Sequence, residues 1–338
     1  MLTRDDQLTF IGFDGGGTNT RAALLSARGE LLGHGTSGAS NFQSVGVEMA
    51  RRNIAEARAM AIAGRGLNAP STAGFLGMAG VVSERDRETI LSIATELEIA
   101  RTLDADHDIR IALAGGLAGA PGIALIAGTG SSCYGRNSAG ESWRAGGWGH
   151  LLDDLGSGYR LGLEGMIAIA RAADGRSIGT SLTSRLTNAL GLEHIDDLSR
   201  RVGHDGLSRA DIAALAPLVL EAAGDGDNAA SDILERGADE LAIMVHAVAT
   251  RLGMDEMVRV ALIGGLFSNR IYAEMVAVAI ARRLPEAIAA PPMLPPVLGA
   301  ALLAMELANI PVTPGVIDRM RAAIPLLAEQ EKKDSSAS

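Results

Sequence analysis

Apolar residues in this chain alternate between short continuous runs and longer stretches with helical spacing. The runs Leu8–Phe13, Thr72–Ala79 and Gly122–Ala127 are short and bounded by turn residues, as in strands buried within a sheet. Between the first two, Val45–Ala63 has apolar residues about three and four positions apart, which predicts a helix with one face on a core. Alternating strands and helices predict an α/β protein built in layers.

The same order of elements occurs twice. Leu8–Phe13 leads into a Gly/Thr loop and a second apolar run, and Gly122–Ala127 leads into another Gly/Thr loop and the extended Cys133–Arg136. We therefore expect a duplicated, two-lobed fold with a central cleft between the copies. The expected N-terminal lobe is 1–107 and the expected C-terminal lobe is 108–338, with a helix near 316–324 packing back on the first lobe.

The composition of the chain excludes several classes of partner and of binding site. The chain has 338 residues, enough for about two domains, and a net charge of −10, which argues against nucleic acid or an anionic membrane as partner. Lys332 and Lys333 are its only lysines, so a Walker A loop or another buried-lysine site is excluded. Cys133 is the only cysteine, which excludes an internal disulfide or a Cys-rich metal site and favours a reducing, cytoplasmic location.

The first Gly/Thr loop has residues that suit a phosphate. Consecutive glycines let the chain turn tightly and bring N–H groups close to an anion, and threonine hydroxyls add donors. An acidic residue just before the glycines can hold a hydrated Mg²⁺ that bridges to a phosphate. The metal carboxylate would be Asp14, and the phosphate contacts would come from Gly15, Gly16, Gly17, Thr18 and Thr20. An ordinary glycine-rich hairpin is the alternative.

The second loop repeats these features after a similar strand, which favours phosphate binding over two unrelated turns. Its residues are Gly128, Thr129, Gly130 and Ser131. Together the two loops resemble the phosphate motifs of the actin, sugar-kinase and Hsp70 superfamily.

Four separated motifs occur in the order typical of one family in that superfamily. They are Phe13–Thr18, Ile126–Ser131, Gly146–His150 and Gly156–Tyr159, and a further match follows at Ile263–Gly265. They resemble the BadF/BadG/BcrA/BcrD ATPase family, which includes N-acetylglucosamine and glucosamine kinases. The resemblance implies an actin-like (ribonuclease H-like) ATPase fold that uses ATP and Mg²⁺.

The resemblance also implies a catalytic base. In the family, an aspartate that starts a helix before the second loop accepts the proton of the sugar hydroxyl, and Asp108 matches it best. A carboxylate in that position contributes roughly 10²–10⁴ in rate. The alternative is that Asp106 or Asp108 only caps the helix, with His107 as a packed or exposed neighbour.

Sugar and adenosine contacts follow from the same resemblance. The expected sugar contacts are Asn41, Gly147, Trp148 and Asp154, and the expected adenosine motif is Gly264 with Gly265. The alternatives are a turn-forming asparagine, a core tryptophan and a plain strand-to-helix turn. The family usually has Gly-Asp-Glu-Gly-Ser where this chain has Asp153-Asp154-Leu155-Gly156-Ser157, so Leu155 replaces an expected glutamate.

The expected function is ATP-dependent phosphorylation of an amino sugar, N-acetylglucosamine at its C6 hydroxyl. Glucosamine and N-acetylmuramic acid are alternative substrates. Two other classes remain open: an ATPase activator of an iron–sulfur dehydratase or reductase, which needs cluster-binding cysteines, and a binding regulator without catalysis. We expect a small-molecule sugar as partner, no nucleic acid and no membrane. The resemblance also implies a homodimer, which is common among such kinases.

Overall fold

The computed structural model describes residues 8–64, 70–204 and 206–328. The chain divides into two compact units, one formed by 1–120 with 292–338 and the other by 121–291. Each unit is built on a five-stranded sheet. Within the described part of the chain, no helix combines the length and apolar character needed to cross a membrane.

The sheet of the first unit has the strand order β3-β2-β1-β4-β5. β1 pairs with β2 in antiparallel and with β4 in parallel, and β4 pairs with β5 in parallel. The parallel strands β1, β4 and β5 therefore end at the same edge of the sheet. Their bounds are β1 (Thr9–Gly15), β2 (Thr20–Ser26), β3 (Leu31–Ser37), β4 (Ser71–Met78) and β5 (Ala100–His107).

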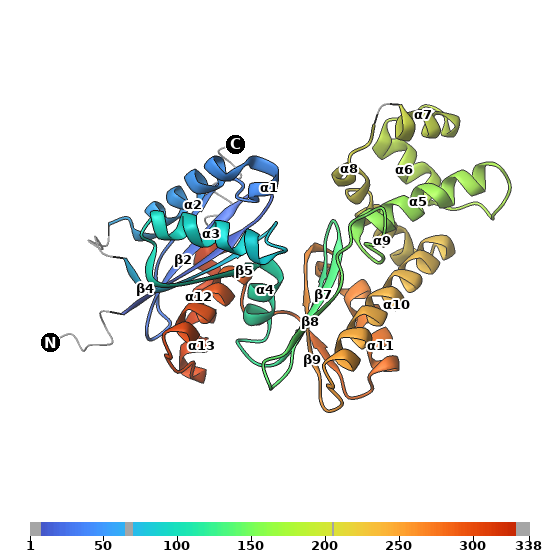
Figure 1. Cartoon of the computed structure of the whole chain (residues 1–338). Helices are drawn as coiled ribbons and strands as arrows, with labels where there is room; N and C mark the ends of the chain where they lie inside the picture. The colour runs from blue at the N-terminus through green and yellow to red at the C-terminus, as the bar shows by residue number, and fades with distance from the viewer. Residues whose placement is uncertain (1–7, 65–69, 205, 329–338) are drawn as a thin grey trace. The chain divides into compact units, whose positions relative to one another are not determined.

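Helices cover both faces of this sheet (Figure 1). α2 and α3 bury residues such as Ile54 and Ile90 on one face. α4, α12 and α13 pack on the other face around Phe10 and Phe75. The helices of the first unit are α1 (Phe42–Val45), α2 (Val47–Ile62), α3 (Glu84–Glu96), α4 (Asp108–Gly116), α12 (Pro296–Leu307) and α13 (Pro314–Ala322).

The second unit repeats the strand, loop and antiparallel strand of the first. Its sheet has the order β10-β9-β6-β7-β8, from β6 (Gly122–Ala127), β7 (Ser131–Arg136), β8 (Ser142–Gly146), β9 (Arg259–Ile263) and β10 (Ile288–Ala290). One core joins the sheet to the helices. These are α5 (Gly158–Ala173), α6 (Leu182–Leu190), α7 (Leu198–Gly203), α8 (Arg209–Ala213), α9 (Ala216–Gly224), α10 (Asn228–Arg251) and α11 (Arg270–Arg283), with the 3₁₀ turns η2 (Ile195–Asp197) and η3 (Gly265–Ser268).

The structure confirms the α/β class and the repeated order of strands and loops, and it corrects the expected domain boundary. The first unit continues to residue 120 instead of ending at 107, because α4 packs against α12 in the first unit. The carbonyls of Gly115 and Gly116 accept hydrogen bonds from the amides of Leu294 and Met293. The chain returns to the first unit at residue 292, so α12 belongs there as well as α13.

The contact between α12 and β1 depends on a glycine. A Cβ on Gly12 would lie 2.3 Å from the amide nitrogen of Ala301 and 2.6 Å from the carbonyl oxygen of Val297. Both atoms belong to the backbone of α12, so they cannot move aside as the tip of a side chain does.

We expect Gly12→Ala to destabilise the protein by about 1–3 kcal/mol, because overpacking would force β1 and α12 apart. Thermal melting followed by circular dichroism measures the effect. Gly179→Ala is the matched control, since a Cβ there meets no atom within 4 Å, and it should stay within about 0.5 kcal/mol of the parent. Equal melting temperatures for the two variants would contradict the packing argument.

Candidate active site

The first Gly/Thr loop joins β1 to β2 and is tied to the segment that follows β3. The amide of Gly16 donates to the carbonyl of Asn19 at 2.8 Å and closes the turn. The carbonyl of Gly16 accepts from the amides of Ser40 and Asn41, at 3.0 and 3.1 Å. Asn41 is therefore held beside this loop.

The threonines of this loop lie in different environments. Thr20 is fully buried, and its hydroxyl donates to the carbonyl of Gly38 at 2.7 Å. Gly17 and Thr18 are exposed at the tip of the hairpin. Thr20 thus fixes the hairpin from within, while the tip is free to meet a ligand.

Asp14 lies at the end of β1, next to Arg21 on β2. The two side chains form an ion pair with 3.6 Å between Nη1 and Oδ2, and both line a cavity of about 180 Å³. Among the described residues, no cluster of three or more His, Cys, Asp or Glu could enclose a metal ion. Mg²⁺ commonly keeps several waters and binds one or two carboxylates plus phosphates, so a single carboxylate at a cavity fits it.

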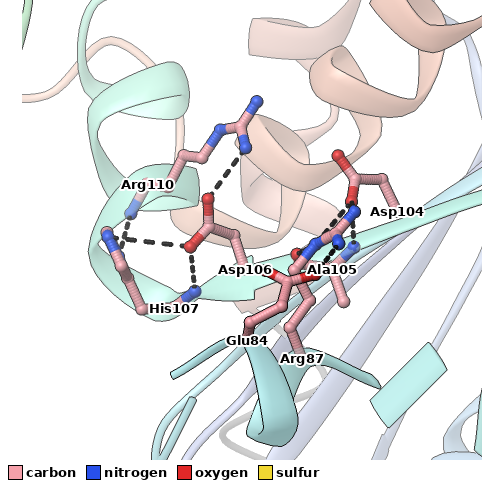
Figure 2. Close-up of polar contacts among 7 residues, drawn as sticks. All are labelled: Glu84, Arg87, Asp104, Ala105, Asp106, His107 and Arg110. Carbon is pink, nitrogen blue, oxygen red and sulfur yellow. Dashed lines mark hydrogen bonds and ion pairs between the residues drawn. The ribbon is translucent and has the colours of Figure 1, made fainter. Parts of the chain in front are cut away.

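Asp108 is the first residue of α4, directly after β5. Hydrogen bonds among Asp106, His107 and Arg110 fix the start of this helix (Figure 2). Nδ1 of His107 accepts from the amide of Arg110 at 3.2 Å, so His107 is the N-cap of the helix. The carboxylate of Asp106 accepts from the guanidinium of Arg110 at 2.8 Å and from the amide of His107 at 2.7 Å. The alternative that Asp106 or Asp108 caps the helix is therefore wrong, because His107 supplies the cap.

The environment of Asp108 makes its carboxyl a better proton acceptor. Burial raises the pKa of Asp108, and the nearby His107 and the backbone N–H groups at the start of α4 offset part of that rise. A carboxylate more basic than an exposed aspartate suits general base catalysis near neutral pH.

A second ion-pair group in Figure 2 fastens β5 to α3. The guanidinium of Arg87 bonds Asp104 at 2.5 Å and Glu84 at 2.6 Å, and it also donates to the carbonyl of Ala105 at 2.9 Å. These contacts hold the C-terminal half of β5, which Asp108 directly follows.

The register of the sheet brings the candidate residues of this unit to one edge. Gly77 on β4 pairs with Asp14 on β1 and with Asp106 on β5. Asn41 reaches the same edge: its Oδ1 accepts from the amide of Gln43, whose side chain donates to the carbonyl of Gly80 just after β4. Asn41 therefore caps α1, as the turn-forming alternative expects, and its role in sugar binding remains a prediction.

The second Gly/Thr loop is held by the start of α5. The amides of Gly158 and Tyr159 donate to the carbonyls of Gly128 and Thr129, at 2.8 and 3.2 Å. Within the described residues, no hydrogen bond engages the amides of Thr129 and Gly130. These two N–H groups are therefore available to an anion.

Ser131 and Asp154 form a buried clamp at the base of this loop. The amide of Ser131 donates to one oxygen of Asp154 at 3.0 Å, and its hydroxyl donates to the carbonyl of Leu155 at 2.9 Å. The other oxygen of Asp154, whose side chain is 3% exposed, pairs with Arg209 at 2.7 Å. Sequence reasoning missed Arg209, because its distance from the loop along the chain gives no signal, and the role of Asp154 toward a sugar remains a prediction.

Trp148 lies on an exposed segment after β8. Its side chain is 70% exposed, so the alternative of a core aromatic is wrong. Gly147 and Gly149 on either side have positive φ values of 75° and 87°, and the amide of Trp148 donates to Asp153. This arrangement presents the indole to solvent, where it can meet a ligand.

Gly264 and Gly265 lie between β9 and η3. A Cβ on Gly264 would lie 2.3 Å from the carbonyl oxygen of Ala127, and its φ of 115° is open to glycine alone. The pair is thus a strand-to-helix turn packed against the end of β6, directly before the second loop. A Cβ on Gly265 would meet no atom within 4 Å, so there is open space beside it.

Comparison with known proteins identifies relatives along most of the chain. The chain is 34% identical over 314 residues to an N-acetyl-D-glucosamine kinase of Dictyostelium discoideum, covering 88% of this chain and 98% of the relative. It is 33% identical over 264 residues to an N-acetylmuramic acid/N-acetylglucosamine kinase of Clostridium acetobutylicum, covering 78% and 86%.

A solved structure shares the fold. A candidate N-acetylglucosamine kinase from Chromobacterium violaceum superposes with a TM-score of 0.70 at 29% identity, covering 88% of this chain and 99% of that one. This likeness confirms the expected actin-like sugar kinase fold. A profile of the BadF/BadG/BcrA/BcrD ATPase family matches residues 11–304, and the chain belongs to that family.

Proposed function

We propose that this protein is an ATP-dependent amino-sugar kinase that phosphorylates the C6 hydroxyl of N-acetylglucosamine. The observation that carries the proposal is the edge of the first sheet, where the register gathers the Asp14 loop, Asn41 and the start of α4 with Asp108. Support for the sugar comes from the relatives that are named as N-acetylglucosamine kinases.

The proposed chemistry divides among a few groups. Asp108 accepts the proton of the attacking hydroxyl, a role that its partly buried carboxyl suits. Backbone N–H groups of both Gly/Thr loops bind the phosphates of ATP. Asp14 holds a hydrated Mg²⁺, which supplies positive charge against the phosphate oxygens. Gly264 and Gly265 bound the space for adenosine, and Trp148 with Asn41 contacts the sugar.

The alternative of an iron–sulfur dehydratase activator is disfavoured by Cys133. Its side chain is fully buried on β7, and burial raises the pKa of the thiol far above its usual range. A cluster needs accessible thiolates, and this chain has a single cysteine. Phosphoryl transfer to a sugar therefore accounts for the residues better.

ADP release over a panel of acceptors tests the proposal. The panel holds N-acetylglucosamine, glucosamine, N-acetylmuramic acid and a water-only reference, and the product is located by NMR. We expect fast, sugar-dependent release with N-acetylglucosamine and phosphate on O6. Equal rates with and without every sugar would contradict a kinase, and a higher kcat/KM for another member would reassign the substrate.

Asp108→Asn should lower sugar-dependent turnover by on the order of 10²-fold or more, because the amide cannot accept the proton. Affinity for ATP should stay close to that of the parent, since the phosphate loops are intact. The melting temperature should not fall, because the exchange removes a carboxylate whose charged form burial disfavours. Parent-like turnover would exclude Asp108 as the base.

Asp14→Asn should raise the Mg²⁺ concentration needed for half-maximal activity by about tenfold or more, since an amide is a weaker ligand for Mg²⁺ than a carboxylate. A Mg²⁺ titration of the coupled assay measures the shift, and ADP binding in EDTA serves as the control that should not weaken. An unchanged Mg²⁺ requirement would remove Asp14 from the metal site.

A further inference from the structure

We propose that Arg209 is a phosphate ligand of the second Gly/Thr loop, and that Asp154 holds its guanidinium ready for the terminal phosphates of a nucleotide. This inference rests on the proposed function, because it names a residue that would bind the nucleotide of the same reaction. Each residue that carries it lies in the second unit.

The position of Arg209 against the loop is the first observation. Its Nη2 would lie 2.2 Å from a Cβ built on Gly130, so the guanidinium occupies the space that a side chain at that position would take. Glycine at position 130 therefore lets the arginine lie directly against the loop backbone. The amides of Thr129 and Gly130, which bond no other described residue, belong to the same loop.

The ion pair with Asp154 is the second observation. The Asp154 carboxylate is almost fully buried, yet the side chain of Arg209 is 41% exposed. One edge of the guanidinium is thus fixed at 2.7 Å from Asp154, and its remaining N–H donors can meet an anion. A planar guanidinium held in this way can donate two parallel hydrogen bonds to phosphate oxygens.

The charge of the chain gives the third argument. A phosphoryl-transfer site needs cations to balance the nucleotide phosphates, and P-loop enzymes use a lysine for this purpose. This chain carries a net charge of −10, and its two lysines, Lys332 and Lys333, lie outside the described residues. Arg209, which lies against Gly130, is a cation that the described structure places beside the loop.

Arg209 could instead serve only to neutralise the buried carboxylate of Asp154. Loss of Arg209 would then destabilise the protein, because an unpaired buried charge is costly. The double variant, which lacks both charges, would then regain the stability that is lost when Arg209 alone is replaced. The two explanations therefore differ in what the double variant does to nucleotide affinity.

Calorimetric binding of MgADP and of adenosine to the full-length protein, without sugar, tests the inference. We expect Arg209→Gln to weaken the affinity for MgADP by about tenfold or more and to leave the affinity for adenosine unchanged, because the lost contact is to phosphate. Arg209→Lys should recover part of the affinity as a point charge without the planar guanidinium. Arg236→Gln is the matched control. This exposed arginine pairs with Glu164 at 3.6 Å, and its loss should change the affinity for neither ligand.

The double variant Asp154→Asn with Arg209→Gln decides between the explanations. A phosphate contact is supported if the double variant melts at the same temperature as Asp154→Asn but binds MgADP more weakly than that single variant. MgADP affinity restored to that of Asp154→Asn alone would overturn it. If the parent protein binds MgADP and Arg209→Gln weakens it while no sugar is phosphorylated, the proposed function fails but the assignment of Arg209 stands. No MgADP binding by the parent would overturn both.

Discussion

The parallel register of β1, β4 and β5 is the constraint on which the candidate residues of the first unit depend. Because these strands run in the same direction, the loop after each leaves the sheet at one edge. Asp14 and the proposed base Asp108 are far apart in the sequence, and the sheet brings them to one edge, where hydrogen bonds to Gly16 also hold the segment carrying Asn41. The network of Asp106, His107 and Arg110 then sets the direction in which α4 leaves that edge.

The second unit uses the same strand, loop and strand but fastens its loop differently. The carbonyls of Gly128 and Thr129 are taken by the start of α5, which turns them away from a ligand and leaves N–H groups available. The buried carboxylate of Asp154 also fastens this loop, because it accepts from the amide of Ser131 and from the guanidinium of Arg209. The two units thus share the order of strand, loop and antiparallel strand, while different contacts hold each loop.

Much of the fold was predictable because it depends on local patterns. The buried runs at β1, β4 and β6 and the glycine-rich loops after β1 and β6 are short-range signals, and the structure confirms them. The boundary at residue 120 was not predictable, since it depends on α4 packing against α12 from the far end of the chain. The pairing of Arg209 with Asp154 was missed because it depends on a tertiary contact that residue spacing does not encode. The capping role of His107 is local, since its ring accepts from the amide three residues on, but it was missed because aspartate is the more usual N-cap residue.

The burial of Cys133 has a practical consequence for work on this protein. Its sulfur lies inside the second sheet, two residues past the Gly/Thr loop, and is not exposed to solvent. Thiolate is the species that alkylating agents and oxidants attack, and burial suppresses its formation. A thiol-specific reagent would therefore react with the folded chain slowly and with the unfolded chain fast. The rate at which this single cysteine is labelled therefore reports how often the second unit opens.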